Sequence, residues 1–183
     1  MTIDIILGIL LAGALSNNYA LLHFLGTGAV LENRRTASRS MLLGLGTTLV
    51  MVLATLITWP LNRYALSSAP YLQTLVFVVI VLIVVECIHL VAKNTLERFC
   101  EVDFVKFAIN GAVLGLCIHN TVSGFLEAVI TAAAVGIGFT LTITLYGILH
   151  GRLDEESVPK AFRGLPIDLL LAGMIVLALL ALA

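Results

Sequence analysis

The chain has 183 residues, of which 60% are hydrophobic and 11% are charged, with a net charge of −1 and a mean hydropathy of +1.10. A soluble domain carries about a quarter charged residues, so this composition excludes a soluble globular protein and predicts an integral membrane protein. The net charge gives no indication of nucleic-acid binding, and no basic cluster suggests it.

Apolar stretches of the length that a membrane-spanning helix needs, roughly 20 residues, or nearly that length, occur six times. In chain order they cover 3–25, 41–59, 72–92, 104–118, 125–149 and 167–182. We expect the first to be retained as a span, because neither a basic region nor a small-residue cleavage site marks a signal peptide. The sequence therefore predicts an all-α membrane protein with one polytopic domain over residues 1–183.

The basic residues predict the orientation of these segments. Nine of the ten lie between segments one and two, three and four, or five and six, with Lys106 just inside the start of segment four: Arg34, Arg35, Arg39, Lys93, Arg98, Lys106, Arg152, Lys160 and Arg163. Only Arg63 lies in another connection. Because Lys and Arg gather on the cytoplasmic side, six spans with both termini outside are expected.

A short motif occurs twice, as Gly28-Ala29-Val30-Leu31 and as Gly111-Ala112-Val113-Leu114. Both copies edge or interrupt an apolar segment, the first and the fourth. Six spans with this echo suggest two three-span halves, about 1–95 and 96–183, of which the second is inverted relative to the first. In such inverted repeats, broken helices of both halves meet near the midplane. We expect segments one and four to be broken or half helices that face each other.

Four runs resemble the A subunit of the Rnf complex and its relative, the E subunit of the Na⁺-pumping NADH:quinone reductase (Nqr). They are 17–26, 110–115, 134–139 and 158–164, and the resemblance covers essentially the whole chain. It implies pairing with an oppositely oriented sister subunit (Rnf E or Nqr D). It also implies a shared midplane [2Fe-2S] cluster, with further iron–sulfur clusters, FMN and riboflavin in partner subunits. Such complexes couple electron transfer to Na⁺ or H⁺ transport in the bacterial or archaeal cytoplasmic (inner) membrane.

The chain departs from this family at the residues that hold the cluster. The resemblance implies one cysteine in each broken helix, but Gly28 and Gly111 stand at these positions. Iron–sulfur iron takes thiolate ligands, which glycine cannot supply. Cys117, His23 and His119 are weak substitutes, because the nearer two are displaced along and around the helix. We therefore expect this chain to scaffold a cluster path rather than to ligate iron.

The other two cysteines, Cys87 and Cys100, form no CxxC pattern with Cys117, so free cysteines are expected. Small-residue pairs also recur along the segments, as Gly44 with Gly46, Gly111 with Gly115, and Gly136 with Gly138. Ordinary close packing between membrane helices explains these pairs best.

Glu86 and Glu127 fall inside apolar segments, where an ionisable residue suggests an ion or proton path. Alternatively, Glu86 pairs with His89 one turn away, and Glu127 reaches the headgroups from the start of its segment. The amides of Asn17, Asn18 and Asn110 either line a polar cavity between the half helices or satisfy backbone groups freed by the breaks. Asp168, like the other acidic residues near segment ends, is interpreted as solvated.

Two functional hypotheses remain at this point. In the first, the chain is a membrane subunit of an Rnf/Nqr-type ion-translocating redox complex, which uses ferredoxin and NAD or NADH and quinone. In the second, it is a non-redox transporter or channel subunit with the same inverted-repeat fold. Catalysis by this chain alone is not expected, because the sequence has no nucleophile, base pair or cofactor motif. The transported ion and the direction of electron flow stay open.

Overall fold

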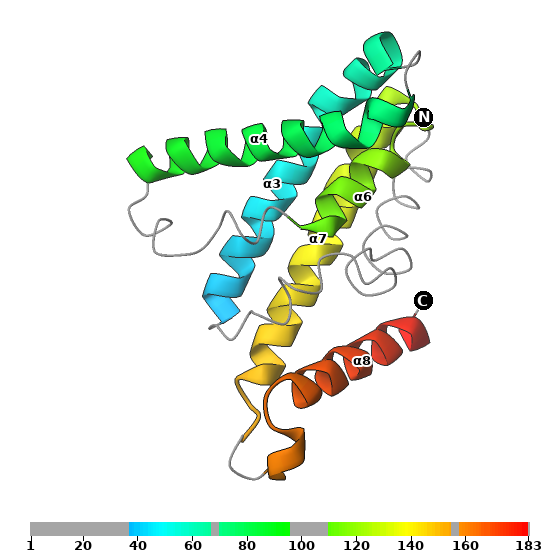
Figure 1. Cartoon of the computed structure of the whole chain (residues 1–183). Helices are drawn as coiled ribbons and strands as arrows, with labels where there is room; N and C mark the ends of the chain where they lie inside the picture. Colours follow the sequence, from blue (N-terminus) through cyan, green and yellow to red (C-terminus); the bar gives the residue numbers. More distant parts are fainter. Residues whose placement is uncertain (1–36, 67–69, 96–109, 155–157, 183) are drawn as a thin grey trace.

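The structure is a computed structural model that describes residues 37–66, 70–95, 110–154 and 158–182. Within these ranges every regular element is helical, as the composition predicts. The elements are α3 (Ala37–Leu61), η2 (Asn62–Leu66), η3 (Pro70–Leu72), α4 (Gln73–Thr95), α6 (Gly111–His119), α7 (Phe125–His150), η5 (Lys160–Phe162) and α8 (Leu165–Leu182) (Figure 1).

Three stretches are long and apolar enough to cross a membrane: Ser40–Leu66, Gln73–Val91 and Phe125–His150. They match the predicted segments 41–59, 72–92 and 125–149. The α8 helix supplies a shorter apolar stretch, Leu165–Ala178. The α6 helix has nine residues, about 13 Å at 1.5 Å per residue, so it is too short to span. Segment 3–25 and residues 104–109 lie outside the described residues, and six spans stay a prediction.

The second predicted segment ends at Trp59, but the helix continues beyond it. Pro60 lies inside the last turn of α3, and the backbone then forms the π-helical turn η2 from Asn62 to Leu66. A proline inside a helix removes one backbone hydrogen bond and crowds the preceding turn. A widened π turn directly after Pro60 accommodates this disturbance, so the helix lengthens by a turn instead of ending there.

The α3 and α7 helices form the centre of the molecule and lie side by side along most of their length (Figure 1). They are antiparallel, because Gly44 of α3 meets Thr140 while the later Thr48 meets the earlier Gly136. The α6 helix packs against α3 and α4, and α8 packs against α7. The core is therefore built on the antiparallel pair of α3 and α7, and the short α6 packs beside this pair.

The two central helices bury equivalent faces. Positions that are 92 residues apart are buried in both helices at Ser40 and Ala132, Leu43 and Val135, Thr47 and Phe139, Val50 and Thr142, Met51 and Ile143, and Ala54 and Tyr146. These positions recur at three- and four-residue intervals, which places them on one stripe of each helix. Each helix thus presents the same stripe to the interior.

The connection from α7 to α8 contains the Pro159-x-x-Phe162-Arg163-Gly164 sequence. The backbone N–H of Phe162 donates to the Pro159 carbonyl (2.8 Å), and Arg163 Nε donates to the Val158 carbonyl (2.8 Å). Gly164 has φ = 81°, a left-handed conformation that favours glycine. This glycine lets the chain turn sharply into α8, whose first residue is Leu165.

Candidate functional site

The fourth predicted segment is divided at Asn110, which is the N-cap of α6. Its backbone is extended, and its side-chain oxygen accepts a hydrogen bond from the Val113 N–H at 3.1 Å. A helix start leaves four N–H groups without partners, and an asparagine cap satisfies one of them. Asn110 therefore satisfies backbone at the break, while its place in an ion path stays a prediction.

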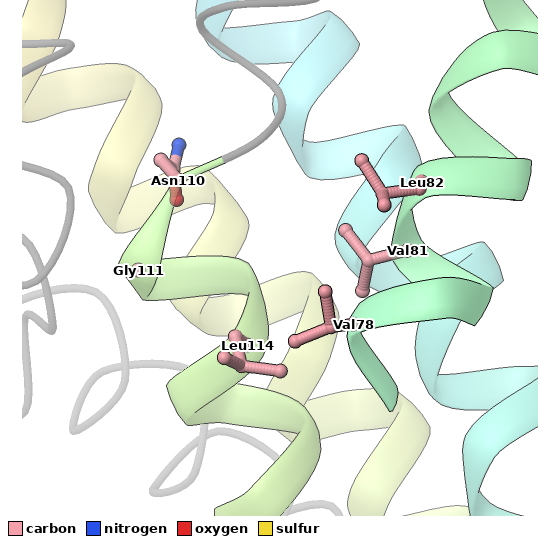
Figure 2. A pocket seen from close by; sticks show the side chains of 6 residues that line it. All are labelled: Val78, Val81, Leu82, Asn110, Gly111 and Leu114. Carbon is pink, nitrogen blue, oxygen red and sulfur yellow. The ribbon is translucent and has the colours of Figure 1, made fainter. Parts of the chain in front are cut away.

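A pocket of about 220 Å³ opens beside the start of α6, between this helix and α4. Its lining residues are Val78, Val81, Leu82, Asn110, Gly111 and Leu114 (Figure 2). Asn110 contributes the single polar side chain of this lining. The position where the resemblance implies a cysteine, Gly111, thus opens on an apolar pocket.

The two described substitutes for cluster ligands lie elsewhere. Cys117 is buried, and its thiol faces the hydroxyls of Thr55 and Thr58 on α3, whereas the pocket at Gly111 faces α4. The six-residue separation corresponds to about 9 Å along the helix and about 120° around it. His119 is exposed at the last residue of α6. Neither side chain belongs to the pocket, and Gly28 and His23 lie outside the described residues.

The two carboxylates predicted inside spans are both exposed on the surface of this chain. Glu86 lies on α4 near the half-buried His89, and the described part of the chain contains no ion pair between them. Glu127 lies in the first turn of α7, where the helix dipole stabilises a negative charge. An ion or proton path through either residue stays a prediction, as it does for Asn17 and Asn18, which lie outside the described ranges.

The α3 and α7 helices cross at two glycines and two threonines. A Cβ atom on Gly44 would lie 2.7 Å from Thr140 Cα, and one on Gly136 would collide with Thr48 Cγ2. The Thr48 and Thr140 hydroxyl oxygens are 3.0 Å apart, and each also lies 2.9 Å from the carbonyl four residues earlier. The two hydroxyl protons are shared among these three oxygen–oxygen contacts. The crossing is therefore both close and locally polar.

Asp168 is not a solvated residue, and the prediction is wrong here. It is 3% exposed, and its Oδ1 lies 3.0 Å from His150 Nε2 at the end of α7. Tyr146 lies one turn earlier, with its ring centroid 5.8 Å from that of His150. The sharp turn at Gly164 folds α8 back on α7, and this return buries a carboxylate that the sequence places near a segment end.

A family model described as "Rnf-Nqr subunit, membrane protein" matches residues 6–183. The chain belongs to the Rnf-Nqr family. The A subunit of the ion-translocating oxidoreductase complex of Syntrophotalea carbinolica is 33% identical over 182 residues, which cover 96% of this chain and 94% of that protein. The A subunit of the Na(+)-translocating ferredoxin:NAD(+) oxidoreductase complex of Acetobacterium woodii is 32% identical over 179 residues, covering 94% and 93%.

Membership in the Rnf-Nqr family identifies this chain as a membrane subunit of an ion-translocating oxidoreductase complex. The resemblance implies a [2Fe-2S] cluster, and the described half of that site does not fit one. The pocket at Gly111 offers one amide and aliphatic side chains, but cluster iron takes thiolates. Within the described ranges, no group of three or more His, Cys, Asp or Glu side chains lies together.

The sequence prediction missed the partners of two glycines in this Rnf-Nqr subunit. The spacing of small residues predicts close packing at Gly44 and Gly136, but it does not identify Thr48 and Thr140 as the residues that face them. A signal for this contact exists in the sequence: Gly44-Leu45-Gly46-Thr47-Thr48 and Gly136-Ile137-Gly138-Phe139-Thr140 share a Gly-x-Gly-x-Thr pattern. Aligning these copies gives the 92-residue separation seen in the Thr48–Thr140 contact.

Proposed function

We propose that this Rnf-Nqr subunit scaffolds the electron path of its complex across the membrane without ligating cluster iron. The complex would couple electron transfer, from ferredoxin to NAD or from NADH to quinone, to the transport of Na⁺ or H⁺. The observation that carries the scaffolding role is Gly111: it starts α6 beside an apolar pocket, where a ligand cysteine would be needed. The other position at which the resemblance implies a ligand cysteine is also a glycine, Gly28, which has no side chain to bind iron.

The proposal includes six spans in two inverted halves, with both termini on the outer, non-cytoplasmic side of the cytoplasmic membrane. The antiparallel crossing of α3 and α7 supports this arrangement, because the contacts are symmetric: a glycine of each helix packs against a threonine of the other. A twofold axis in the membrane plane would relate two such helices. The equal 92-residue separation of the contacting residues also agrees with a duplicated three-span unit.

We place the oppositely oriented sister subunit, of the Rnf E or Nqr D type, against α4. Of the residues in the membrane-spanning part of α4, 28% are buried inside this chain. The corresponding shares are 44% for Ser40–Leu66, which begins in α3, and 56% for α7. The exposed face of α4 includes Glu86 and Cys87. A carboxylate on a membrane-facing surface is costly, so a neighbouring subunit that offers a polar partner to Glu86 is favoured. FMN, riboflavin and the remaining iron–sulfur clusters belong to other subunits in this proposal.

The test uses the complex purified with all its partners, and a subcomplex of this chain with its sister. Low-temperature EPR of the reduced subcomplex, together with an iron and sulfide count, reports whether a [2Fe-2S] cluster is present. A matched variant carries Gly28→Cys and Gly111→Cys together. We expect no cluster signal from the original subcomplex, electron transfer by the full complex, and additional iron in the variant.

A [2Fe-2S] signal from the original subcomplex would overturn the scaffolding role, since other ligands would then hold iron. An intact complex that moves ions but transfers no electrons would overturn the redox function. That second result would favour the alternative hypothesis, a transporter or channel subunit built on the same fold. Unchanged iron content in the double-cysteine variant would refute the assignment of Gly28 and Gly111 to the ligand positions.

A further inference from the structure

The antiparallel helices α3 and α7 give a common scale of depth across the membrane. Thr48 of α3 faces Gly136 of α7 at their crossing. The same number of residues leads from Thr48 forward to Trp59 and from Gly136 back to Phe125. The rings of Trp59 and Phe125 are in contact, with centroids 5.2 Å apart. The end of α3 and the start of α7 therefore lie at one level.

Several connections meet at this level. The π turn η2 continues α3, η3 leads into α4, and the turn after α6 is held beside them by the bond from Trp59 Nε1 to the Ser123 carbonyl (2.8 Å). These elements share one end of the molecule, opposite the connection from α7 to α8 (Figure 1). We call it the tyrosine end, which consists of Asn62–Leu66, Pro70–Leu72 and residues 120–124.

Two tyrosines project from this end. Tyr64 in η2 is 83% exposed and Tyr71 in η3 is 81% exposed, whereas Tyr146 inside α7 has no exposed surface. Arg63, next to Tyr64, is also exposed. A side chain with an apolar ring and a polar tip suits the boundary between hydrocarbon and water, where Tyr and Trp form belts around membrane proteins.

The length of the first described span places Tyr64 at such a boundary. Ser40–Leu66 has 27 residues, about 40 Å at 1.5 Å per residue, but the hydrocarbon core is only about 30 Å thick. A span that enters the core at Ser40, directly after Arg39, leaves it near Trp59, after roughly 20 residues. The η2 turn follows within the headgroup layer, which adds about 5–8 Å on each side.

The start of α7 indicates the same boundary independently. Glu127 is exposed in the first turn of this helix, two residues after Phe125. A carboxylate is costly in hydrocarbon, so the headgroups must lie within reach of this turn. Because Phe125 is level with Trp59, both central helices place the edge of the hydrocarbon at the same height.

We propose that the tyrosine end docks in the phospholipid headgroup layer, with Tyr64 and Tyr71 as its anchors. Their rings lie against the glycerol region, and their hydroxyls donate to lipid ester and phosphate oxygens. The Arg63 guanidinium matches the geometry of a lipid phosphate. The docking does not rest on the proposed redox function. It is also independent of the predicted orientation, which makes this end the outer one.

This docking fixes the depth of the pocket at Gly111. The Cys117 side chain of α6 is hydrogen-bonded to Thr55 and Thr58 of α3, about one turn inside the boundary at Trp59. The α6 helix runs toward the tyrosine end (Figure 1), and Gly111 lies six residues before Cys117, about 9 Å along the helix. The start of α6 is therefore close to the middle of a core that is about 30 Å thick.

Tryptophan fluorescence of the full chain in phosphatidylcholine vesicles tests the docking, with quenching by lipids brominated either near the headgroup or near the chain ends. Tyr64→Trp in a Trp59→Phe background puts the single tryptophan in η2, and phenylalanine keeps a ring against Phe125. Leu49→Trp in the same background is the matched control, on an exposed position near the middle of the span. We expect headgroup bromines to quench Tyr64→Trp more strongly, and chain-end bromines to quench Leu49→Trp more strongly.

Two results for Tyr64→Trp would overturn the proposal. Quenching by aqueous iodide but by neither lipid would place the tyrosine end in water, as expected for a face that binds a subunit outside the membrane. Stronger quenching by chain-end bromines would place η2 in the hydrocarbon.

The unmodified chain gives a check that needs no substitution, because Trp59 is its single tryptophan and lies at the proposed boundary. Headgroup bromines should quench Trp59 more strongly than chain-end bromines, and the reverse order would contradict the docking. Tyr64→Ala combined with Tyr71→Ala should reduce this difference, since the side chains that fix the depth are lost. An unchanged difference would refute the anchoring role of the two tyrosines.

Discussion

Replacing Gly44 with alanine tests the central contact of this structure. The added Cβ would lie 2.7 Å from Thr140 Cα, whereas carbon atoms in favourable contact lie about 3.5–4.0 Å apart. Thr140 Cα is a backbone atom, so a side-chain rotation cannot relieve the collision. The α3 and α7 helices must separate by roughly 1 Å where they cross.

The expected cost is about 2 kcal/mol. Overpacking a well-packed interior costs about 1–3 kcal/mol. Separation of the helices also weakens the 3.0 Å contact between the Thr48 and Thr140 hydroxyls, which contributes about 0.6 kcal/mol if it resembles other interhelical bonds in membranes. Alanine opposes this loss by about 0.5–1 kcal/mol through helix propensity. For a chain of this length, the net cost lowers Tm by about 4–8 °C.

Thermal unfolding of the full chain in detergent, followed by Trp59 fluorescence, measures this effect. Trp59 is the single tryptophan, and it contacts Phe125 of α7, so its emission reports on the α3–α7 pair. Gly173→Ala in α8 is the matched control, because a Cβ there meets nothing within 4 Å. The control should keep or raise Tm by propensity alone. A Gly44→Ala variant as stable as Gly173→Ala would refute the close crossing.

Three further variants follow from the same structure and the same unfolding assay. Asn110→Ala removes the N-cap bond and should cost about 1 kcal/mol, whereas Asn110→Ser, which can still cap, should lose little. Thr48→Val removes the interhelical hydroxyl contact and should cost about 0.6 kcal/mol; a stabilised variant would contradict it. Asp168→Ala and His150→Ala should each destabilise by about 1–3 kcal/mol, and their double variant by clearly less than the sum.

The membrane helices were predictable because length and hydropathy decide them. Segments 72–92 and 125–149 correspond to α4 and α7 within a few residues, since apolar runs bounded by polar residues leave few alternatives. The end of α3 was not predictable in this way. Proline normally marks a helix end, but here the backbone continues into the π-helical turn Asn62–Leu66, next to the contacts of Trp59 with Ser123 and Phe125.

The candidate site was predictable only in part. Gly111 as a helix start and Asn110 as the residue beside the break follow from local patterns, because caps act within one turn. The burial of Asp168 does not follow from such patterns. It depends on how α8 folds back on α7, and hydropathy contains no information about that geometry.

The two internal echoes of this Rnf-Nqr subunit have different physical requirements. The Gly44 and Gly136 echo is fixed by sterics, because a side chain at either position meets the facing helix at less than contact distance. In the other echo, Gly111 borders a pocket of about 220 Å³ on its α4 side, and Gly28 lies outside the described residues. Gly111 belongs to α6 and not to either helix of the central α3–α7 pair. If the scaffolding proposal is right, the variant with Gly28→Cys and Gly111→Cys should gain iron while its α3–α7 contact stays unchanged.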